Sequence, residues 1–329
     1  MTASFPAHWQ AGRCPLHPEA DHRRVIDDAT DQFFGLGGHF AYDACQRCGA
    51  WALSPRPPPA ELGEYYGGYY TEPLLTELRS AAKRGRIIGP GRLRALAFLR
   101  GLKKAGATVE PGMKLLDAGA GLGAFARFVR DIGRLEVRGV DFSPRCVAYA
   151  QEIHGLTMDT GELAAQRYED GRFDFVTAWH YLEHVYDPSA DLKEIWRITK
   201  PGGWLMIETP TNDLLSRIFG RRWFYLLPPT HLYHYRPQTL AGLIEGAGYQ
   251  VRRVARPWFP GELAASVMLS LGLFGFIPKL YGAGRPPALR LLTAAFYAQM
   301  LYDVPLTLVN ALLGHSGIVR IFAQKPRGD

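Results

Sequence analysis

Short apolar runs alternate with longer stretches of mixed polarity through the middle of the chain, residues 109–259. Apolar runs bounded by glycine or proline predict buried strands, and the mixed stretches between them predict helices. This alternation is typical of a parallel sheet with helices on its faces, so the expected fold class is α/β. The strands are expected to end at Asp117, Asp141, Trp179 and Ile207, and to occupy residues 249–254 and 317–323.

The flanking regions follow other patterns. Residues 10–54 carry three of the four cysteines, and the proline-rich stretch Ser54–Pro59 predicts a linker or the exit from a strand. Residues 55–108 predict a basic helical region, since residues 79–104 contain nine Lys and Arg and no Asp or Glu. Residues 260–314 are apolar and interrupt the α/β pattern. The expected parts are therefore 10–54, 55–108, 109–259 with 315–329, and 260–314.

Composition and charge exclude few functional classes. The 329 residues are 47% hydrophobic and 21% charged, which is an ordinary balance for a chain with a sizeable core. The net charge of +7 indicates a negative partner, and nucleic acid, anionic lipid and a phosphorylated substrate all fit. Met1–Gln10 lacks the charged and apolar segments of a signal peptide, so a cytoplasmic location is expected.

A glycine-rich turn follows the first expected strand. Gly119, Gly121 and Gly123 alternate with other residues between Asp117 and a helix that starts near Ala124. Glycine permits unusual backbone torsions and lets a ligand approach the main chain. The nicotinamide fingerprint has the spacing G-x-G-x-x-G, which this turn lacks. An acid directly before the glycines would repel a pyrophosphate, but it suits the ammonium group of an amino-acid-like ligand.

The next strand also ends in an acid. Asp141 lies 18 residues after Gly123, where a carboxylate can accept both hydroxyls of a ribose. Phe142 follows and is well placed to lie against an adenine ring. The alternative is that Asp141 merely caps the next helix, which begins at Ser143 and Pro144.

At this point the stretch Leu115–Pro210 resembles class I S-adenosylmethionine (SAM)-dependent methyltransferases, especially the group that includes quinone and sugar methyltransferases. Residues 181–188, YLEHVYDP, resemble the family's LEHV-x-DP turn after its fourth strand, and residues 198–207 resemble its LKPGG turn into the fifth. The resemblance implies a Rossmann-like seven-stranded sheet. The expected last two strands are then its sixth and seventh.

The resemblance also implies a cofactor map. Asp117, Gly119 and Gly121 would line the methionine end of SAM, and Asp141 would hold the ribose. Phe142, Glu162 and Leu163 would contact the adenine, while Ala178 and Trp179 would flank the sulfonium.

The cysteine-bearing region contains two metal-binding pairs by spacing. Cys14 and His17 form a C-x2-H pair, and Cys45 and Cys48 form a C-x2-C pair. Four such ligands predict a closed, structural zinc site, unless the two pairs are unrelated. The fourth cysteine, Cys146, is expected to be simply buried.

A similar cysteine lobe occurs in some sugar methyltransferases, followed by a tyrosine-rich segment that residues 64–70 match. These tyrosine rings either cover the cofactor or acceptor or pack in the core. In this lobe His17 stands where cysteine is commoner.

Methyl transfer to a hydroxyl or an acidic carbon needs a base to take the proton. The candidates, in order, are His231, His180 and His184, with His234 beside the first. The resemblance favours His231, because the family often brings a histidine from this segment over the active site. Some quinone methyltransferases use a divalent ion held by a glutamate-rich turn, but His180 replaces the first acid here, so only zinc is expected.

The apolar insertion has two interpretations. Its first uncharged run, 263–278, is short, and Asp303 separates the other two, 291–302 and 304–314. None of them predicts a bilayer span of about 20 residues. The first interpretation is peripheral contact with the inner face of the membrane, aided by the basic region. The second is a soluble lid or a homodimer interface.

Three functional classes remain. The first is a methyltransferase that acts on an oxygen or carbon of a small-molecule acceptor, with lipid-, quinone- and sugar-linked acceptors as the expected classes. The second is an RNA methyltransferase, disfavoured because no amino-methylation motif or RNA module is found. The third is a non-catalytic scaffold with a SAM fold, which would need none of Asp117, Gly119, Gly121 and Asp141.

Overall fold

The computed structural model describes residues 5–31, 37–66, 70–84, 91–257, 262–271, 303–305, 308–309, 312 and 316–327. The chain forms two compact units, each assembled from separate parts of the sequence. Unit 1 comprises Met1–Tyr69, Pro210–Thr239 and Arg256–Val319, and unit 2 comprises Tyr70–Thr209, Leu240–Ala255 and Arg320–Asp329. The four-part division expected from the sequence stays a prediction.

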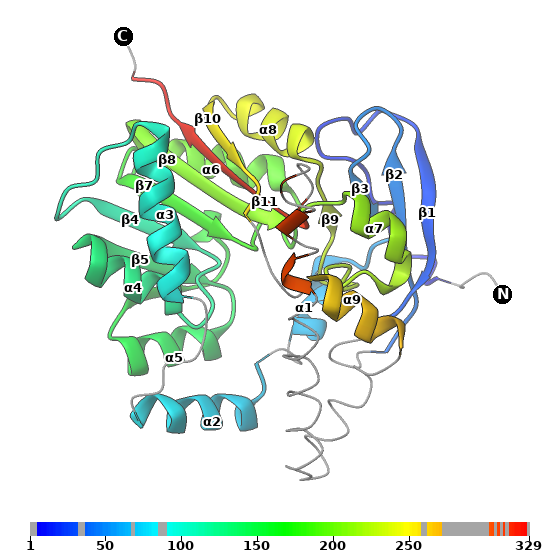
Figure 1. Ribbon diagram of the computed structural model, residues 1–329, viewed down its shortest axis with the longest axis horizontal. Coiled ribbons are helices and arrows are strands. Elements are labelled where there is room, and N and C mark those ends of the chain that lie inside the picture. Colours follow the sequence, from blue (N-terminus) through cyan, green and yellow to red (C-terminus); the bar gives the residue numbers. More distant parts are fainter. Residues whose placement is uncertain are drawn as a thin grey trace. The chain divides into compact units, whose positions relative to one another are not determined.

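The described elements are labelled in Figure 1. The strands are β1 His22–Ala29, β2 Phe40–Cys45, β3 Trp51–Leu53, β4 Lys114–Ala118, β5 Glu136–Asp141, β6 Thr157–Thr160, β7 Phe173–Trp179, β8 Thr199–Pro210, β9 Tyr233–His234, β10 Gln250–Ala255 and β11 Ile318–Gln324. The helices are α1 Pro59–Tyr66, α2 Glu72–Lys83, α3 Gly91–Ala105, α4 Ala124–Gly133, α5 Pro144–His154, α6 Pro188–Ile198, α7 Leu214–Phe219, α8 Pro237–Gly246 and α9 Glu262–Ser270. Two short 3-10 helices are η1 Ala164–Gln166 and η2 Gly220–Arg222.

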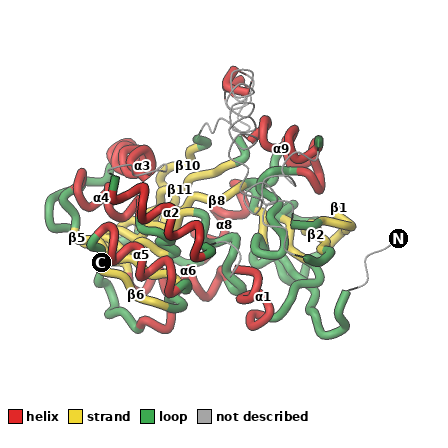
Figure 2. The backbone as a smooth tube through the Cα atoms, turned by 90° about the horizontal axis from the view of Figure 1, so that it is seen from below, coloured by secondary structure: helices red, strands yellow, loops and turns green. Residues whose placement is uncertain are grey.

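Unit 2 is built on a seven-stranded sheet with the order β10-β11-β8-β7-β4-β5-β6. The pairs β4–β5, β4–β7, β5–β6 and β7–β8 are parallel, and β10–β11 is antiparallel. Helices lie along both faces of this sheet (Figures 1 and 2). The seven-stranded, Rossmann-like α/β prediction is therefore confirmed, and the expected strands match the observed ones to within a few residues.

The strand order reverses beside β4, because β5 lies on one side of it and β7 on the other. Ligands of such sheets bind beyond the carboxyl ends of the strands at the point of reversal. A ligand site is therefore expected beyond the carboxyl ends of β4, β5 and β7.

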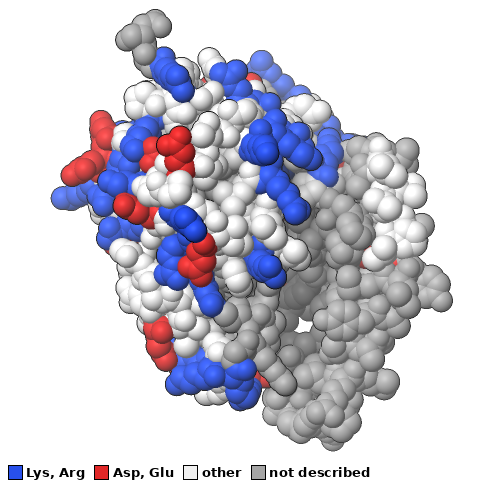
Figure 3. All heavy atoms as spheres, turned by 60° about the vertical axis from the view of Figure 1, so that its left-hand side comes forward, with Lys and Arg blue, Asp and Glu red and all other residues white. Residues whose placement is uncertain are grey.

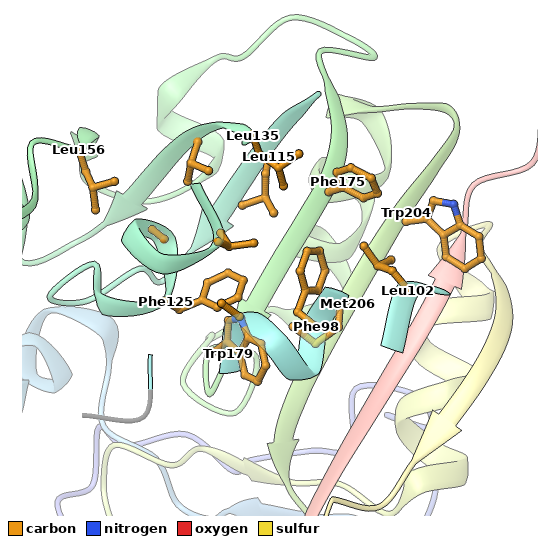
Figure 4. Close-up of a cluster of buried hydrophobic side chains, with 14 of the residues drawn as sticks. Phe98, Leu102, Leu115, Phe125, Leu135, Leu156, Phe175, Trp179, Trp204 and Met206 are labelled. Carbon is orange, nitrogen blue, oxygen red and sulfur yellow. The ribbon is translucent and has the colours of Figure 1, made fainter. Parts of the chain in front are cut away.

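One face of the sheet packs against α3, α4 and α5 through a large apolar cluster (Figure 4). Phe98 is fully buried there, with its ring edge-to-face against Phe125 and Phe175 at centroid distances of 5.7 and 6.1 Å. Burial of one such side chain contributes about 1.5–3 kcal/mol. Alternation along the strands puts Leu115 of β4 in this cluster, and Asp117 two residues later therefore points to the same face.

Helix α3 approaches this sheet closely. A Cβ placed on Gly101 would lie 2.1 Å from Cζ of Phe322 in β11, so only glycine fits at this contact. The close approach fixes α3, including Arg94 in its first half, against the sheet.

Unit 1 contains a second sheet that the sequence did not predict, with the order β1-β2-β3-β9. The pairs β1–β2, β2–β3 and β3–β9 are antiparallel. Its core is aromatic: the rings of Trp51 and Trp223 pack edge-to-face with His234 at 6.2 and 4.9 Å. The hydroxyl of buried Tyr42 donates to the carbonyl oxygens of Leu226 and His231, which fixes the segment that carries the candidate histidines.

The apolar insertion lies largely outside the described residues. Its first helix, α9, is anchored by Glu262, which accepts hydrogen bonds from the Trp223 indole at 2.9 Å and the Gly317 amide at 3.0 Å. Burial raises the pKa of Glu262 to about 8. Within the described residues, no helix is long and apolar enough to span a bilayer. Membrane contact and a dimer interface both stay predictions.

Charge is distributed rather than concentrated on the face drawn in Figure 3, where Lys and Arg lie among Asp and Glu. Several basic side chains of unit 2 are paired locally, for example Arg138 with Asp159 at 2.7 Å and Lys200 with Asp174 at 2.6 Å. An unbroken basic stripe of the kind that tracks a nucleic-acid backbone is not visible on that face.

Candidate functional site

The glycine turn of unit 2 adopts the backbone that its sequence predicts. Gly119, Gly121 and Gly123 have φ of +68°, +52° and +75°, in the left-handed region that favours glycine. A Cβ on Gly119 would also lie 2.6 Å from the ring of Tyr181. The turn therefore needs glycine for its torsions and for close packing, and it brings the main chain to the open end of β4.

Asp117 ends β4 as a buried carboxylate, 2% exposed. The Thr177 hydroxyl donates to its Oδ1 at 2.7 Å. Burial raises the pKa of Asp117 to about 7, although the Thr177 bond and the charge of Arg94 act against the rise. A carboxylate held in this way is stabilised by any cation that enters the site.

Asp141 ends β5, where its two oxygens tie the neighbouring loops together. Oδ2 accepts from the Gly121 amide at 2.8 Å, and Oδ1 accepts from the Ser143 amide at 2.9 Å. Each carboxylate oxygen can accept a second hydrogen bond, so a pair of ribose hydroxyls still finds acceptors. The N-cap of α5 is Ser143 and not Asp141, because the Ser143 side chain accepts from the Cys146 amide.

The residues expected around an adenine lie on the loops after β5 and β6. The Phe142 side chain is 49% exposed, although it directly follows a buried strand. Leu163 is 2% exposed and Glu162 is exposed. A flat heteroaromatic ring such as adenine can pack against the accessible ring of Phe142 and beside Leu163, with the Glu162 carboxylate next to it.

Tyr70 lies near the glycine turn in unit 2. Its hydroxyl would be 3.7 Å from a Cβ on Gly121, and its carbonyl accepts from Arg145 at 3.4 Å. Burial and the nearby acids, Asp141 among them, raise the Tyr70 pKa above its usual value. Of the tyrosine-rich segment, Tyr65 and Tyr66 belong to unit 1, and residues 67–69 lie outside the described residues. Tyr70 is therefore the ring of that segment that borders the glycine turn.

The end of β7 supplies Ala178 and Trp179, both buried. The Trp179 ring lies in the apolar cluster, 5.0 Å from the Phe125 centroid, and the guanidinium groups of Arg94 and Arg320 lie 5.3 and 4.9 Å from its centroid. Its indole N–H has no hydrogen-bond partner among the described residues. That Trp179 flanks a sulfonium stays a prediction.

His180 occupies a strained position directly after β7. Its φ of +48° is unusual for a residue other than glycine. Its Nδ1 lies 3.2 Å from Glu183 Oε1, and its Nε2 lies 3.6 Å from Glu208 Oε1. The other oxygens are occupied, since Thr209 donates to Glu183 at 2.9 Å and Arg320 pairs with Glu208 at 2.8 Å. His180 is therefore held between two buried carboxylates.

The protonation of this network follows from its charges. Burial alone would lower the pKa of His180, but the bonds with Glu183 and Glu208 outweigh it and raise that pKa. Burial opposes ionisation of Glu208, yet the His180 bond and the Arg320 charge hold its pKa at about 2. The pKa of Glu183 is lowered for the same reason, against its burial. The charges of the network therefore favour the ionised form of each of these three groups.

The remaining candidate bases are distributed over both units. His184 lies in unit 2, half-buried, and its amide donates to the Tyr181 carbonyl at 2.9 Å. His231 and His234 lie in unit 1, both buried, with ring centroids 5.6 Å apart. The His231 amide donates to the Leu227 carbonyl at 3.0 Å, which holds this segment in a tight turn.

Sequence reasoning missed three charged members of the unit 2 site. Glu208 and Arg320 appeared as isolated charges within apolar strands, and that pattern alone could have marked them as paired. Arg94 was counted only as part of a basic region. Nothing in its local sequence indicates that α3 carries it over Trp179.

The four expected metal ligands of unit 1 converge. The ligand atoms of Cys14, His17, Cys45 and Cys48 all lie within 4.8 Å of one another. Sγ of Cys14 and Sγ of Cys48 are 3.5 Å apart, close to the separation of two thiolates on one tetrahedral zinc. His17 Nδ1 is buried with no partner among the described residues, which a metal would supply. This donor set fits zinc.

The turn between β2 and β3 shapes one half of that cluster. The Gly49 amide donates to the Cys45 carbonyl at 2.8 Å, and the Cys45 amide donates to the Ala50 carbonyl at 2.9 Å. Gly49 has φ of +73°, so the glycine after the second pair serves the tight turn. The hydrogen bonds of the hairpin therefore shape the turn that carries Cys45 and Cys48.

Comparison with known proteins connects this geometry to a family. A family model described as a methyltransferase domain matches residues 91–254. The ubiquinone biosynthesis O-methyltransferase of Xanthomonas axonopodis pv. citri is 32% identical over 179 residues, 48% of this chain and 73% of that protein. The protein of the same name from Paraburkholderia phymatum is 31% identical over 151 residues, which cover 42% of this chain and 64% of that protein.

Solved structures share the fold. Phosphoethanolamine N-methyltransferase 2 of Haemonchus contortus, in complex with phosphomonomethylethanolamine and S-adenosylhomocysteine, has a TM-score of 0.54 and 18% identity, over 88% of this chain and 70% of that one. A structure from Galdieria sulphuraria, described as that of a sarcosine dimethylglycine methyltransferase, has a TM-score of 0.51 and 18% identity. The match covers 81% of this chain and 99% of that one.

The His180 network generates a test that needs no substrate. Replacing Glu183→Gln removes the nearer of the two negative charges, so the pKa of His180 should fall, because burial then acts with less opposition. The pKa is measured by following the imidazole resonances in a pH titration by NMR. The matched control is Glu245→Gln, an exposed glutamate of α8. An unchanged His180 pKa in Glu183→Gln would contradict the network.

Proposed function

The chain belongs to the class I SAM-dependent methyltransferase superfamily, and from this premise we propose that it transfers a methyl group from SAM to an oxygen or carbon of a small-molecule acceptor. The acceptor is lipid-, quinone- or sugar-linked. One observation carries the proposal: two buried carboxylates, Asp117 and Asp141, lie at the carboxyl ends of adjacent parallel strands beside a turn whose backbone favours glycine. The relatives named ubiquinone biosynthesis O-methyltransferase support transfer to oxygen.

The residues around the turn fit SAM by their chemistry. Asp117 is a buried acid whose carboxylate form is stabilised by a cation, and the amino-acid end of SAM carries an ammonium. Asp141 keeps acceptor capacity for the ribose, and Phe142 offers an accessible ring for the adenine. A scaffold would need none of this set, which weighs against the non-catalytic alternative.

In this proposal the chain's own residues have separate roles. SAM supplies an activated methyl group on its sulfonium. Asp117 and Asp141 fix the donor's two ends, and Tyr70 shields the turn from water, so the protein mainly aligns the acceptor. Both ring nitrogens of His180 are held by carboxylates, Nδ1 by Glu183 and Nε2 by Glu208, so in this proposal His180 orders the end of β7 beside the cofactor. The acceptor's own proton goes to a base, and His231 is the first candidate.

A structural zinc ion is part of the proposal. Three thiolates and one imidazole leave no open position on a tetrahedral ion, so zinc would stabilise unit 1 and take no part in methyl transfer. The pair Cys14 and His17 lies in the loop before β1, and such a loop gains most from a metal tether.

The central experiment incubates the full chain with methyl-tritiated SAM and a total extract of the source cell. Wild-type protein should label a product. Asp141→Ala should reduce labelling to background, because the ribose loses its acceptor. Glu136→Ala removes an exposed acid at the other end of the same strand and should keep full activity. Equal labelling by the Asp141→Ala and Glu136→Ala variants would contradict the assignment of Asp141 to the ribose of SAM.

Partitioning of the labelled product between organic and aqueous phases then assigns the acceptor class. Label in the organic phase supports a lipid or quinone acceptor. Label in the aqueous phase that resists ribonuclease supports a soluble sugar acceptor. Label that ribonuclease releases as small fragments would favour the RNA alternative and reject the small-molecule proposal.

The affinity for SAM should depend on pH through Asp117. Its pKa of about 7 is raised, so the carboxyl is protonated below that pH in the free protein. Only the carboxylate attracts the ammonium, so affinity should fall almost tenfold per unit below about pH 6. Calorimetric titration across this range measures it. Asp117→Asn should bind weakly at every pH, and a pH-independent wild-type affinity would contradict the role of Asp117.

The zinc proposal predicts one zinc ion per chain by elemental analysis. Cys48→Ser removes one of two ligands from the β2–β3 turn, so it should lower the zinc content and the melting temperature together. Cys146→Ser changes a buried cysteine outside the cluster and should retain the metal. A full zinc content in Cys48→Ser would argue against this ligand set.

A further inference from the structure

Unit 1 contains a pocket that the proposed chemistry does not use. It has a volume of about 570 Å³ and is open to solvent on one side. Its walls come from β1, from the turn between β2 and β3, and from the segment that includes α7 and η2. Pockets of this size hold small-molecule ligands. All of its lining residues belong to unit 1, so the pocket is a feature of that unit alone.

The charge of the lining is one-sided. Four arginines line the pocket, and none of its lining residues is Asp or Glu: the arginines are Arg23, Arg47, Arg217 and Arg236. Arg47 pairs with Glu19 at 3.2 Å, but both side chains are about two-thirds exposed, so the pair is weak. The other three have no ion pair within the described part of the chain. Four like charges around one cavity repel one another, and an anion in the cavity relieves that repulsion.

One of these arginines is held in position by the fold. A Cβ placed on Gly49 would lie 2.5 Å from Cζ and 2.6 Å from Nε of Arg236. The guanidinium therefore lies flat against the bare backbone of the turn that ends at Gly49. Buried Trp51 forms part of the same wall. A guanidinium fixed in this way loses little freedom on binding a ligand, so it is prepared to bind.

The cysteine cluster does not account for this charge. Cys45 and Cys48 border the pocket, and three thiolates with one zinc ion carry a net charge of about −1. One arginine neutralises that charge. The other arginines, especially Arg217, which is exposed on α7, remain as excess positive charge that lines the cavity.

We propose that this pocket binds the phosphate or diphosphate group of a phosphorylated ligand. Guanidinium groups match phosphate oxygens in pairs, and several around one cavity select a group with more than one negative charge. The phosphate comes from one of two sources, a soluble sugar nucleotide or a lipid-linked diphosphate.

The test titrates the full, zinc-loaded chain with inorganic pyrophosphate by calorimetry. Wild-type protein should bind it, with an affinity that falls as salt increases. The double variant Arg217→Gln with Arg236→Gln should lose about tenfold or more, since two charge-assisted contacts are removed. The matched control is Arg24→Gln. Arg24 is the next residue after Arg23 on β1, but it pairs with Asp43 and does not line the pocket. Equal affinity in the control and the double variant, or no binding by wild type, overturns the inference.

Two further measurements separate the outcomes. Uridine diphosphate in solution and vesicles that contain phosphatidic acid serve as probes of the two sources, and preferential binding of either, lost in the double variant, identifies the source. SAM binding is measured on the same samples. If pyrophosphate fails to bind while SAM binds, only the pocket assignment fails. If pyrophosphate binds while no extract is labelled, the proposed function fails.

Discussion

The burial of charge at the ends of parallel strands is the constraint on which the rest of unit 2 depends. Asp117, Asp141 and Glu208 lie at or near the carboxyl ends of the parallel strands β4, β5 and β8, and each is less than 9% exposed. A buried carboxylate is costly without partners. The fold supplies different partners to each: a hydroxyl to Asp117, two amides to Asp141, and a histidine and an arginine to Glu208. The acid with the fewest partners, Asp117, is the one best suited to meet a cationic ligand.

The sequence was sufficient to predict a residue's role where that role depends on residues nearby in the chain. The positive φ values of Gly119 and Gly121 follow from the spacing of the turn, and the convergence of Cys14, His17, Cys45 and Cys48 follows from two local pairs. These features need only a few residues of context. The order of the central strands was likewise predictable, because the resemblance covers that part of the chain.

Roles that depend on distant packing could not be predicted. Arg94 reaches Trp179 only because α3 lies close to the sheet, and that approach depends on the fit of Gly101 against Phe322. The sheet of unit 1 was missed because β9 has two residues and joins β3 across more than 150 positions of sequence. No periodicity can be detected in so short a strand.

The two units differ in the sign of the charge that they offer to a ligand. The glycine turn of unit 2 is bordered by carboxylates, which favour the cationic end of a methyl donor. The pocket of unit 1 is bordered by arginines, which favour an anion. A net charge of +7 is therefore not a uniform property of the surface, and its meaning depends on where the unpaired cations lie. The two units therefore favour ligands of opposite charge, a cation at the glycine turn of unit 2 and an anion in the pocket of unit 1.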